Sequence, residues 1–160
     1  MDLLWAPWRE KYVVKVNKKL RKGCTFCAVL KDNKDEKNYI FLRSRLSFAV
    51  LNIYPFNGGH VLILPKRHVD DLDKLTASEM KDMMALVVRV KARIKKALKP
   101  DAFNIGLNLG SAAGAGIPQH MHIHIVPRWK GEMNFMPALF DTKVMPVSLE
   151  RMYQVLVDAN

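Results

Sequence analysis

The chain has 160 residues and a formal net charge of +11, with 49% hydrophobic and 26% charged residues. Its composition is that of an ordinary globular protein, and no apolar run approaches the ~20 residues of a membrane span, which excludes a membrane protein. The N-terminus has no basic segment followed by a long apolar stretch, so we expect no secretory signal, a cytoplasmic location and reduced cysteines.

The positive charge predicts a preference for anions such as nucleotides, nucleic acid or acidic surfaces. Much of it lies in "KVNKKLRKG" and "RVKARIKKALK". A solvated loop and the exposed face of a helix explain these runs better than a nucleic-acid-binding tract. We therefore do not expect nucleic acid to be the partner.

The first half of the chain predicts three strands. "NYIFLRS" and "LSFAVLN" are rich in aromatic and aliphatic residues and suggest a hairpin with a tight turn at residues 43–45. The turn signal "IYPFNGGH" then leads into "HVLILP", a buried strand that His60 opens and Pro65 closes.

A long helix follows, because Thr76 and Glu79 form a capping box and the apolar periodicity ends before Pro100. Its apolar positions are Leu75, Met80, Met83, Met84, Val87, Val90, Ile94 and Leu98. The methionines are typical either of core packing or of an adaptable binding groove, and their spacing favours the core.

The second half predicts two more strands, "AFNIGLN" and "HMHIHIVP", on either side of the glycine-rich loop "LGSAAGAGIP". "SLERMYQVLVDA" is a C-terminal helix with Ser148 as its cap. The expected fold class is α+β, with an antiparallel sheet of about five strands, one long helix packed on it and a C-terminal helix.

Three of the five histidines, His120, His122 and His124, occupy alternate positions in the last predicted strand. Alternate residues of a strand point to one side, so the three rings should share a surface. Such a surface suits a metal site, nucleophilic catalysis or a polar face without a function. The adjacent glycine-rich loop offers backbone N–H groups for a phosphate, which favours phosphorus chemistry.

Histidine suits this chemistry because its neutral ring is nucleophilic near pH 7. A partner that accepts the Nδ1 proton leaves Nε2 free to attack. An N-linked phosphoryl intermediate keeps a good leaving group, so a second acceptor can discharge it. The pattern thus predicts a two-step exchange.

The run "HMHIHIV" fits H-φ-H-φ-H-φ-φ and resembles the histidine triad (HIT) family of nucleotide hydrolases and transferases. "LSFAVLNIYPFNGGHVLILPKRHVDDL" resembles the upstream half of that family, and "NLGSAAGAG" resembles its phosphate-side loop. The resemblance implies a single HIT-like domain over residues 1–160 that pairs as a homodimer. We expect a core at about residues 24–137, an N-terminal arm at 1–23 and a C-terminal extension at 138–160.

The resemblance also implies roles for individual residues. His122 would be the nucleophile that takes the nucleoside phosphate, and His124 would hydrogen-bond the phosphate. His60 would support the triad from the neighbouring strand. Asn52 would hold the ribose hydroxyls, and Asn108 would contact the substrate beside the α-phosphate.

One position departs from the family pattern. Familiar members carry a polar residue three or four places before the first triad histidine, where this chain has Ile117 and Gly116. Gln119 is the candidate to replace that contact to the leaving oxygen. Strand alternation would turn Gln119 away unless the chain bends at Pro118. Gly116 and Gln119 are thus candidate substrate-binding positions.

Cys24 and Cys27 have the C-x₂-C spacing of half a zinc site and of a thiol redox motif. A redox motif usually follows a strand and opens a helix, whereas a lysine-rich loop leads in here. The resemblance to zinc-bearing members of the family implies His68 and His120 as the remaining ligands. A site with four protein ligands implies a structural Zn²⁺.

"LLWAPWREKYV" and "VPRWKGEMNFMP" resemble a branch that acts on dinucleoside polyphosphates, including diadenosine tetraphosphate phosphorylases and hydrolases. Trp5, Trp8 and Trp129 suit either packing or base stacking. Arg128 suits either distal phosphates or solvent at the end of the strand.

Three classes of function remain open. The leading hypothesis is an enzyme that moves the nucleoside monophosphate of a dinucleoside polyphosphate onto His122, then to water or inorganic phosphate. A hydrolase of nucleoside phosphoramidates or other adenylylated compounds would use the same intermediate. The other classes are a non-catalytic nucleotide or nucleic-acid binding module and a redox protein that depends on Cys24 or Cys27.

Overall fold

The computed structural model describes residues 23–132 and 145–159. The predicted arm with Trp5 and Trp8, and the start of the predicted C-terminal extension, lie outside these residues. In the part of the chain that the structure describes, no helix is long and apolar enough to cross a bilayer.

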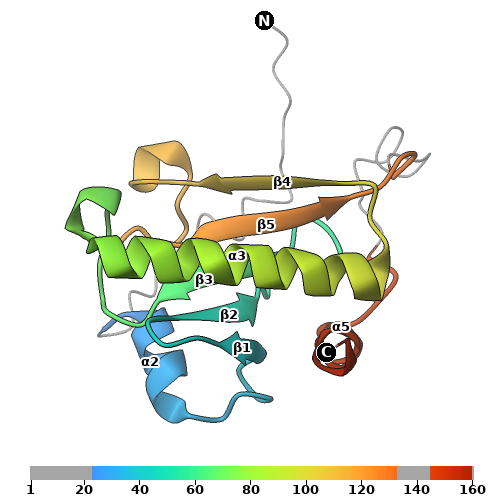
Figure 1. Ribbon diagram of the computed structural model, residues 1–160, viewed down its shortest axis with the longest axis horizontal. Coiled ribbons are helices and arrows are strands. Elements are labelled where there is room, and N and C mark those ends of the chain that lie inside the picture. Colours follow the sequence, from blue (N-terminus) through green and yellow to red (C-terminus); the bar gives the residue numbers. More distant parts are fainter. Residues whose placement is uncertain (1–22, 133–144, 160) are drawn as a thin grey trace, which may run out of the picture.

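A five-stranded sheet with the order β1-β2-β3-β5-β4 forms the centre of the molecule, and every neighbouring pair is antiparallel. The strands are β1 Ile40–Arg43, β2 Ser47–Leu51, β3 Val61–Pro65, β4 Ala102–Leu107 and β5 Ile123–Arg128. The α+β class and the antiparallel sheet are therefore confirmed. Figure 1 shows β4 along the free edge next to β5.

Strand β5 begins later than the sequence predicts. We expected the strand from His120, but regular pairing starts at Ile123. The Met121 N–H donates instead to the Val69 carbonyl at 2.8 Å, beyond the end of β3. This local detour separates the main chain at His120 from the regular sheet.

The predicted long helix and C-terminal helix are both confirmed, and the structure adds three short helical elements. Helix α3, Ala77–Leu98, starts with the predicted capping box of Thr76 and Glu79 and packs against β2, β3 and β5 (Figure 1). Helix α5, Leu149–Asp158, is capped by Ser148 and packs against α3 and β1. The short elements are α2 Thr25–Asp32 and the 3₁₀ turns η2 Leu72–Lys74 and η3 Ser111–Ala113.

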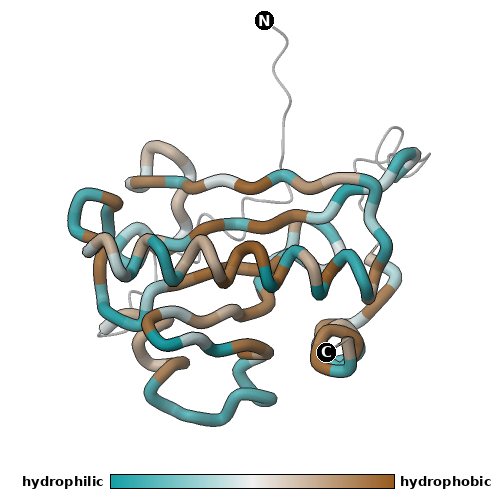
Figure 2. Tube along the Cα trace, in the orientation of Figure 1, coloured by the Kyte–Doolittle hydropathy of each residue, from teal (hydrophilic) through white to brown (hydrophobic). Residues whose placement is uncertain are grey.

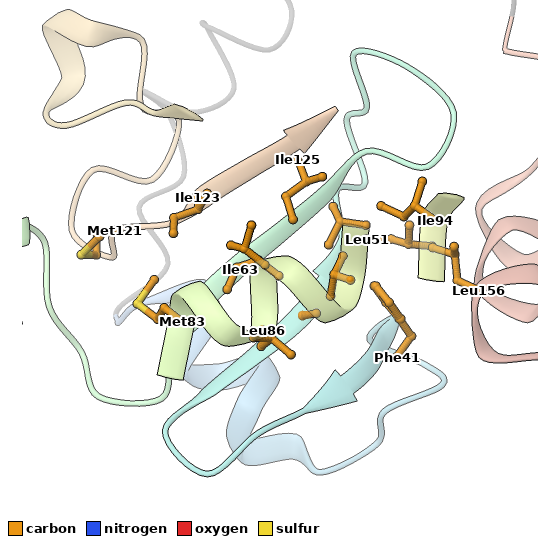
Figure 3. Packing of buried hydrophobic residues seen from close by; sticks show 14 of the residues in the cluster. Phe41, Leu51, Ile63, Met83, Leu86, Ile94, Met121, Ile123, Ile125 and Leu156 are labelled. Atoms are coloured by element: carbon orange, nitrogen blue, oxygen red, sulfur yellow. The ribbon is translucent and has the colours of Figure 1, made fainter. Parts of the chain in front are cut away.

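The main core lies between the sheet and helices α3 and α5. Figure 3 shows Ile63 and Ile125 of the sheet pointing toward Leu86 and Ile94 of α3. Figure 2 shows the hydrophobic residues running along the central strands, with hydrophilic residues in the segment between α2 and β1. The prediction for the methionines is right for one of the three only: Met83 is buried, whereas Met80 and Met84 are 42% and 55% exposed.

A second, smaller cluster covers part of the opposite face of the sheet. Its buried members are Phe26, Ile40, Phe48, Val50, Leu62 and Leu64. Phe26 comes from α2, a helix that was not among the predicted elements. Helix α2 therefore sits on the same face of the sheet as the histidine rings.

Candidate active site and metal cluster

The rings of three histidines lie side by side on the α2 face of the sheet. The ring centroids of His122 and His124 are 4.9 Å apart, and those of His124 and His60 are 5.2 Å apart. The His120 ring lies elsewhere, 5.3 Å from the ring of His68. The structure thus divides the triad between two groups of side chains.

The protonation of His122 follows from one hydrogen bond. Its Nδ1 lies 2.9 Å from the carbonyl oxygen of His120, and since a carbonyl can only accept, Nδ1 must carry the proton. Burial lowers the pKa of His122, which keeps the ring neutral near pH 7. A neutral ring with its proton on Nδ1 leaves a lone pair on Nε2.

A chain of hydrogen bonds fixes the other two rings. The Phe56 N–H donates to His60 Nδ1 at 3.1 Å, so His60 carries its proton on Nε2. His60 Nε2–H then donates to His124 Nδ1 at 2.9 Å, which places the proton of His124 on Nε2. Burial and the neighbouring histidines lower the pKa of His60 to about 3 and that of His124 to about 4. Both rings are therefore neutral.

His124 Nε2 is the one buried side-chain polar atom that has no hydrogen-bond partner among the described residues. Leaving a buried donor without an acceptor costs ~1–3 kcal/mol. A donor in this position, beside a ring that offers a lone pair on Nε2, is suited to an anion. The pair can attack a phosphorus atom and hydrogen-bond one of its oxygens.

Asn52 lies beside His60, and Asn108 lies beside the glycine-rich loop. The Asn52 side chain lies 3.3 Å from His60 Nδ1 through its amide nitrogen, and its oxygen accepts the Tyr54 N–H at 3.0 Å. Asn108 follows β4 and lies next to Gly114 of the glycine-rich loop. Its side-chain amide nitrogen is 3.9 Å from the position that a Cβ would take if Gly114 had one. Both asparagines are half-buried.

Gly116 and Gln119 are both half-buried, and Gln119 stands in the turn directly before His120. Ile117 packs against the cluster that contains Phe26. The proteins that the sequence resembles carry a polar residue at or next to this position. In this chain the Ile117 side chain extends the apolar cluster instead.

Cys24, Cys27, His68 and His120 form a compact cluster whose ligand atoms all lie within 4.8 Å of one another. The Sγ–Nδ1 distances are 3.3 Å from Cys24 to His120, 3.3 Å from Cys27 to His68 and 3.5 Å from Cys27 to His120. A tetrahedral zinc ion with bonds of ~2.0–2.3 Å separates its ligands by roughly 3.3–3.8 Å. These three distances and the S₂N₂ donor set fit this ion.

The tautomer of His120 fits as well. Its Nε2 lies 3.0 Å from the Pro65 carbonyl and must donate to it, so Nδ1 presents a lone pair to the two thiols. Cys24 occupies the N-cap position of α2 without a side-chain hydrogen bond to the helix, and Cys27 stands in its first turn. Burial and then the neighbouring Cys24 raise the pKa of Cys27 to about 11, so without a metal this thiol keeps its proton at pH 7.

Sequence reasoning missed two aromatic walls of the site. The Phe56 ring stacks on His60 with centroids 5.0 Å apart, and the Phe26 ring lies 5.3 Å from that of His122. Phe26 stands between the two cysteines of the C-x₂-C motif and Phe56 in the turn signal before β3, but neither pattern assigns a role to the residue at these positions. Arg128 pairs with Glu132 and donates to Asn104 Oδ1 at 2.7 Å.

Trp129 is half-buried, and its indole Nε1–H donates to the Leu98 carbonyl at 3.4 Å. This bond ties the segment after β5 to the C-terminal end of α3. Of the two alternatives for Trp129, packing and base stacking, this contact corresponds to packing.

Comparison with known proteins agrees with these motifs. The HIT domain family model matches residues 33–131. An AP-4-A phosphorylase of Mycobacterium tuberculosis is 35% identical over 91% of this chain and 77% of its own length. A bis(5'-nucleosyl)-tetraphosphatase [asymmetrical] of Schizosaccharomyces pombe is 41% identical over 59% of this chain and 52% of its own. A solved Zn-bound histidine triad family protein from Mycobacterium smegmatis is 27% identical, with a TM-score of 0.63 over 86% of this chain and 93% of its own.

Proposed function

Because the chain belongs to the HIT domain family, we propose that it cleaves a phosphoanhydride of dinucleoside polyphosphates through a nucleotidyl intermediate on His122. Relatives with the names AP-4-A phosphorylase and bis(5'-nucleosyl)-tetraphosphatase support this class of substrate. The proposal requires a nucleophile and an anion-binding donor at one place.

One observation carries the proposal: the orphaned N–H of His124 lies beside the free lone pair of His122. The Nδ1–H of His122 is held by the His120 carbonyl, and His124 Nε2 has no partner within the described residues. A phosphoryl group would receive both interactions, since its phosphorus is electrophilic and its oxygens accept hydrogen bonds. A bound phosphate would accept the His124 N–H and so remove the free-energy cost of burying this donor without a partner.

In the first step His122 Nε2 attacks the α-phosphorus, and the bond to the bridging oxygen breaks. The distal nucleotide leaves with that electron pair, as ATP when the substrate is diadenosine tetraphosphate. The His120 carbonyl holds the Nδ1 proton and stabilises the positive charge that develops on the ring. His124 donates to an oxygen of the transferred phosphoryl group.

In the second step an acceptor oxygen attacks phosphorus and the P–N bond breaks, which returns the electron pair to His122. Water would release AMP, and inorganic phosphate would release ADP. We propose phosphate as the acceptor, because the AP-4-A phosphorylase aligns with 91% of this chain.

The roles of the flanking residues complete the proposal. Asn52 would bind the ribose hydroxyls, Asn108 would contact the substrate beside the phosphate, and Gly116 and Gln119 would line the leaving-group side. His60 positions His124 through the 2.9 Å hydrogen bond.

Cys24, Cys27, His68 and His120 would hold a structural Zn²⁺, which the S₂N₂ set and its spacing support. With four protein ligands, the ion supplies a cross-link and no open coordination position for chemistry. The cross-link ties α2 to the chain just before β5.

We also propose a homodimer through α3 and β4. Val88 and Met84, one turn apart on α3, are 65% and 55% exposed, and Ile105 on the edge strand β4 is 44% exposed. Strand β4 pairs only with β5 in the described part of the chain, so its other edge offers unpaired backbone groups. A second copy would cover both features.

The test is incubation with diadenosine tetraphosphate, with and without inorganic phosphate, followed by separation of the nucleotides. ADP together with ATP, formed only when phosphate is present, is the expected result. AMP together with ATP would mean that water is the acceptor. No cleavage of diadenosine tetraphosphate by protein that binds nucleotides would overturn the proposal.

A further inference from the structure

We propose that Asn57 and Glu132 are positioning residues that determine which nitrogen of His124 carries its proton. The inference rests on the proposed function for its catalytic meaning, although the protonation itself is measurable without any substrate. It arises from one juxtaposition: a buried amide and a half-buried carboxylate join the turn before β3 to the segment after β5.

Asn57 is 8% exposed, and its side chain is fully engaged. Nδ2 donates to the Pro127 carbonyl at 2.9 Å and to Glu132 Oε2 at 2.7 Å, while Oδ1 accepts the Gly58 N–H at 3.2 Å. A flipped amide would turn its oxygen toward a carbonyl and a carboxylate. Only one orientation of Asn57 therefore satisfies the site.

Glu132 holds the other end of the pair as a carboxylate. Burial acts to raise its pKa, but hydrogen bonds from Arg128, from the Trp129 N–H and from Asn57 outweigh burial and hold the pKa below its usual value. Oε2 accepts the Trp129 N–H at 3.1 Å besides that of Asn57, and Oε1 pairs with Arg128. A carboxylate can only accept here, so it requires the amide of Asn57 as a donor.

The pair reaches the catalytic group through the main chain of the turn. The Asn57 carbonyl accepts the His60 N–H at 3.1 Å, and the preceding residue, Phe56, donates its N–H to His60 Nδ1. Pro127, to which Asn57 is anchored, lies three residues after His124 on β5. The nearer of the two donors to His60 Nδ1, the Phe56 N–H at 3.1 Å against 3.3 Å for the Asn52 amide, is thus fixed relative to the strand that carries His124.

Loosening this anchor would reverse the polarity of the hydrogen-bond chain. Without the Phe56 N–H, the Asn52 amide at 3.3 Å is the one donor to Nδ1 that remains, so in part of the molecules His60 can move its proton to Nδ1 and accept on Nε2. His124 would then donate from Nδ1 and present a lone pair on Nε2. That lone pair would face phosphate oxygens, which also carry lone pairs, so the hydrogen bond to the substrate would be lost.

The experiment uses the metal-loaded, full-length protein labelled with ¹⁵N-histidine. Long-range ¹H–¹⁵N correlation spectra report which ring nitrogen carries the proton in wild type, Asn57→Ala, Glu132→Gln and Asp82→Asn. The last variant is the matched control. Asp82 accepts from Ser44 and Ser47 at 2.5 Å each and joins α3 to the β1–β2 turn, so it is an anchor of similar kind that contacts none of the histidines.

We expect the Nε2–H form of His124 in wild type and in Asp82→Asn, and a mixture of both tautomers in Asn57→Ala. On diadenosine tetraphosphate, kcat should fall by about 10- to 100-fold in Asn57→Ala, the loss expected for a misplaced catalytic group. Should Asn57→Ala not fold, Glu132→Gln, which keeps the shape of the side chain, should show the same mixture to a smaller extent.

An unchanged His124 tautomer in a folded Asn57→Ala protein, or the same mixture in Asp82→Asn, would overturn the inference. If the tautomers respond as expected but the wild type does not cleave dinucleoside polyphosphates, the positioning role stands and the proposed function fails. The two outcomes are therefore read from separate measurements.

Discussion

The carbonyl oxygen of His120 accepts the Nδ1–H of His122 at 2.9 Å, while the ring of His120 points away toward Cys24 and Cys27. One residue thus serves two neighbours through different atoms. Its side chain belongs to the metal cluster, and its main chain sets the tautomer of the proposed nucleophile.

Substitution of His122 should separate binding from turnover. His122→Ala should lower kcat by about 10⁴-fold or more, since loss of a nucleophile removes the covalent route, while AMP still binds through the remaining groups. After acid-free quenching, labelled nucleotide should remain attached to wild type and be absent from the variant. Asp82→Asn, where α3 meets the β1–β2 turn, is the control that should still be labelled; a labelled His122→Ala protein would contradict the assignment.

His124 should matter through its Nε2–H. His124→Ala removes the orphaned donor and should lower kcat by about 10²- to 10³-fold, the cost of one donor to a developing oxyanion. His124→Asn offers an amide N–H in a similar place and should recover part of the loss. Steady-state kinetics on diadenosine tetraphosphate measure both values. Equal activity in wild type and His124→Ala would exclude the proposed role.

The metal cluster should be needed for stability more than for chemistry. We expect one zinc ion per chain by elemental analysis, and proton release on metal binding, because the raised pKa of Cys27 keeps the free thiol protonated at pH 7. His68→Ala should lower Tm and zinc content, while the protein that remains folded keeps most of its kcat. A kcat loss as large as that of His122→Ala would contradict a structural role.

Stability should fall as the pH is lowered, because His60 and His124 resist protonation in the folded state. In the folded state their pKa values are lowered to about 3 for His60 and about 4 for His124, whereas an unfolded histidine titrates near 6.5. Between these values the unfolded state binds more protons, so the free energy of unfolding decreases as pH falls from about 7 to about 4. Each histidine contributes a slope of at most about 1.4 kcal/mol per pH unit.

Urea unfolding at pH 7, 6 and 5 in the presence of EDTA measures this slope without a contribution from metal loss. His124→Asn removes one of the histidines with a lowered pKa and should flatten the dependence by about one histidine's share. The same slope in wild type and variant would show that His124 does not titrate as its burial implies.

The proposed dimer makes a prediction about the surface of α3. Val88→Glu would bury a charge against the second copy, so we expect a monomer by light scattering at concentrations where wild type is a dimer. Arg89→Glu introduces the same side chain at an exposed position about 100° around α3 from Val88 and should remain dimeric. Monomeric wild type would remove the basis of the proposal.

Local signals predicted most of the fold. The capping box of Thr76 and Glu79, the cap at Ser148 and the alternating histidines each involve residues a few positions apart, so their physics is visible in the sequence. The first triad histidine lies outside regular pairing because Met121 bonds to Val69, a contact between distant segments. No local pattern records such a bond.

Helix α2 was missed for a related reason. Its packing depends on Phe26 meeting the sheet and on cysteines that meet His120, which is 96 positions from Cys24. The pair of Asn57 and Glu132 is likewise 75 positions apart. Their residue types are ordinary for turns and surfaces, and only the fold brings them together.

The two roles of His120 constrain its replacement in evolution differently. Binding a metal needs the imidazole of His120, but holding the Nδ1–H of His122 needs only a carbonyl, which every amino acid supplies. A lineage could therefore replace Cys24, Cys27, His68 and even His120 one after another and still keep a correctly protonated nucleophile. In such descendants, packing would have to take over the restraint on α2, and the reaction would continue without the ion.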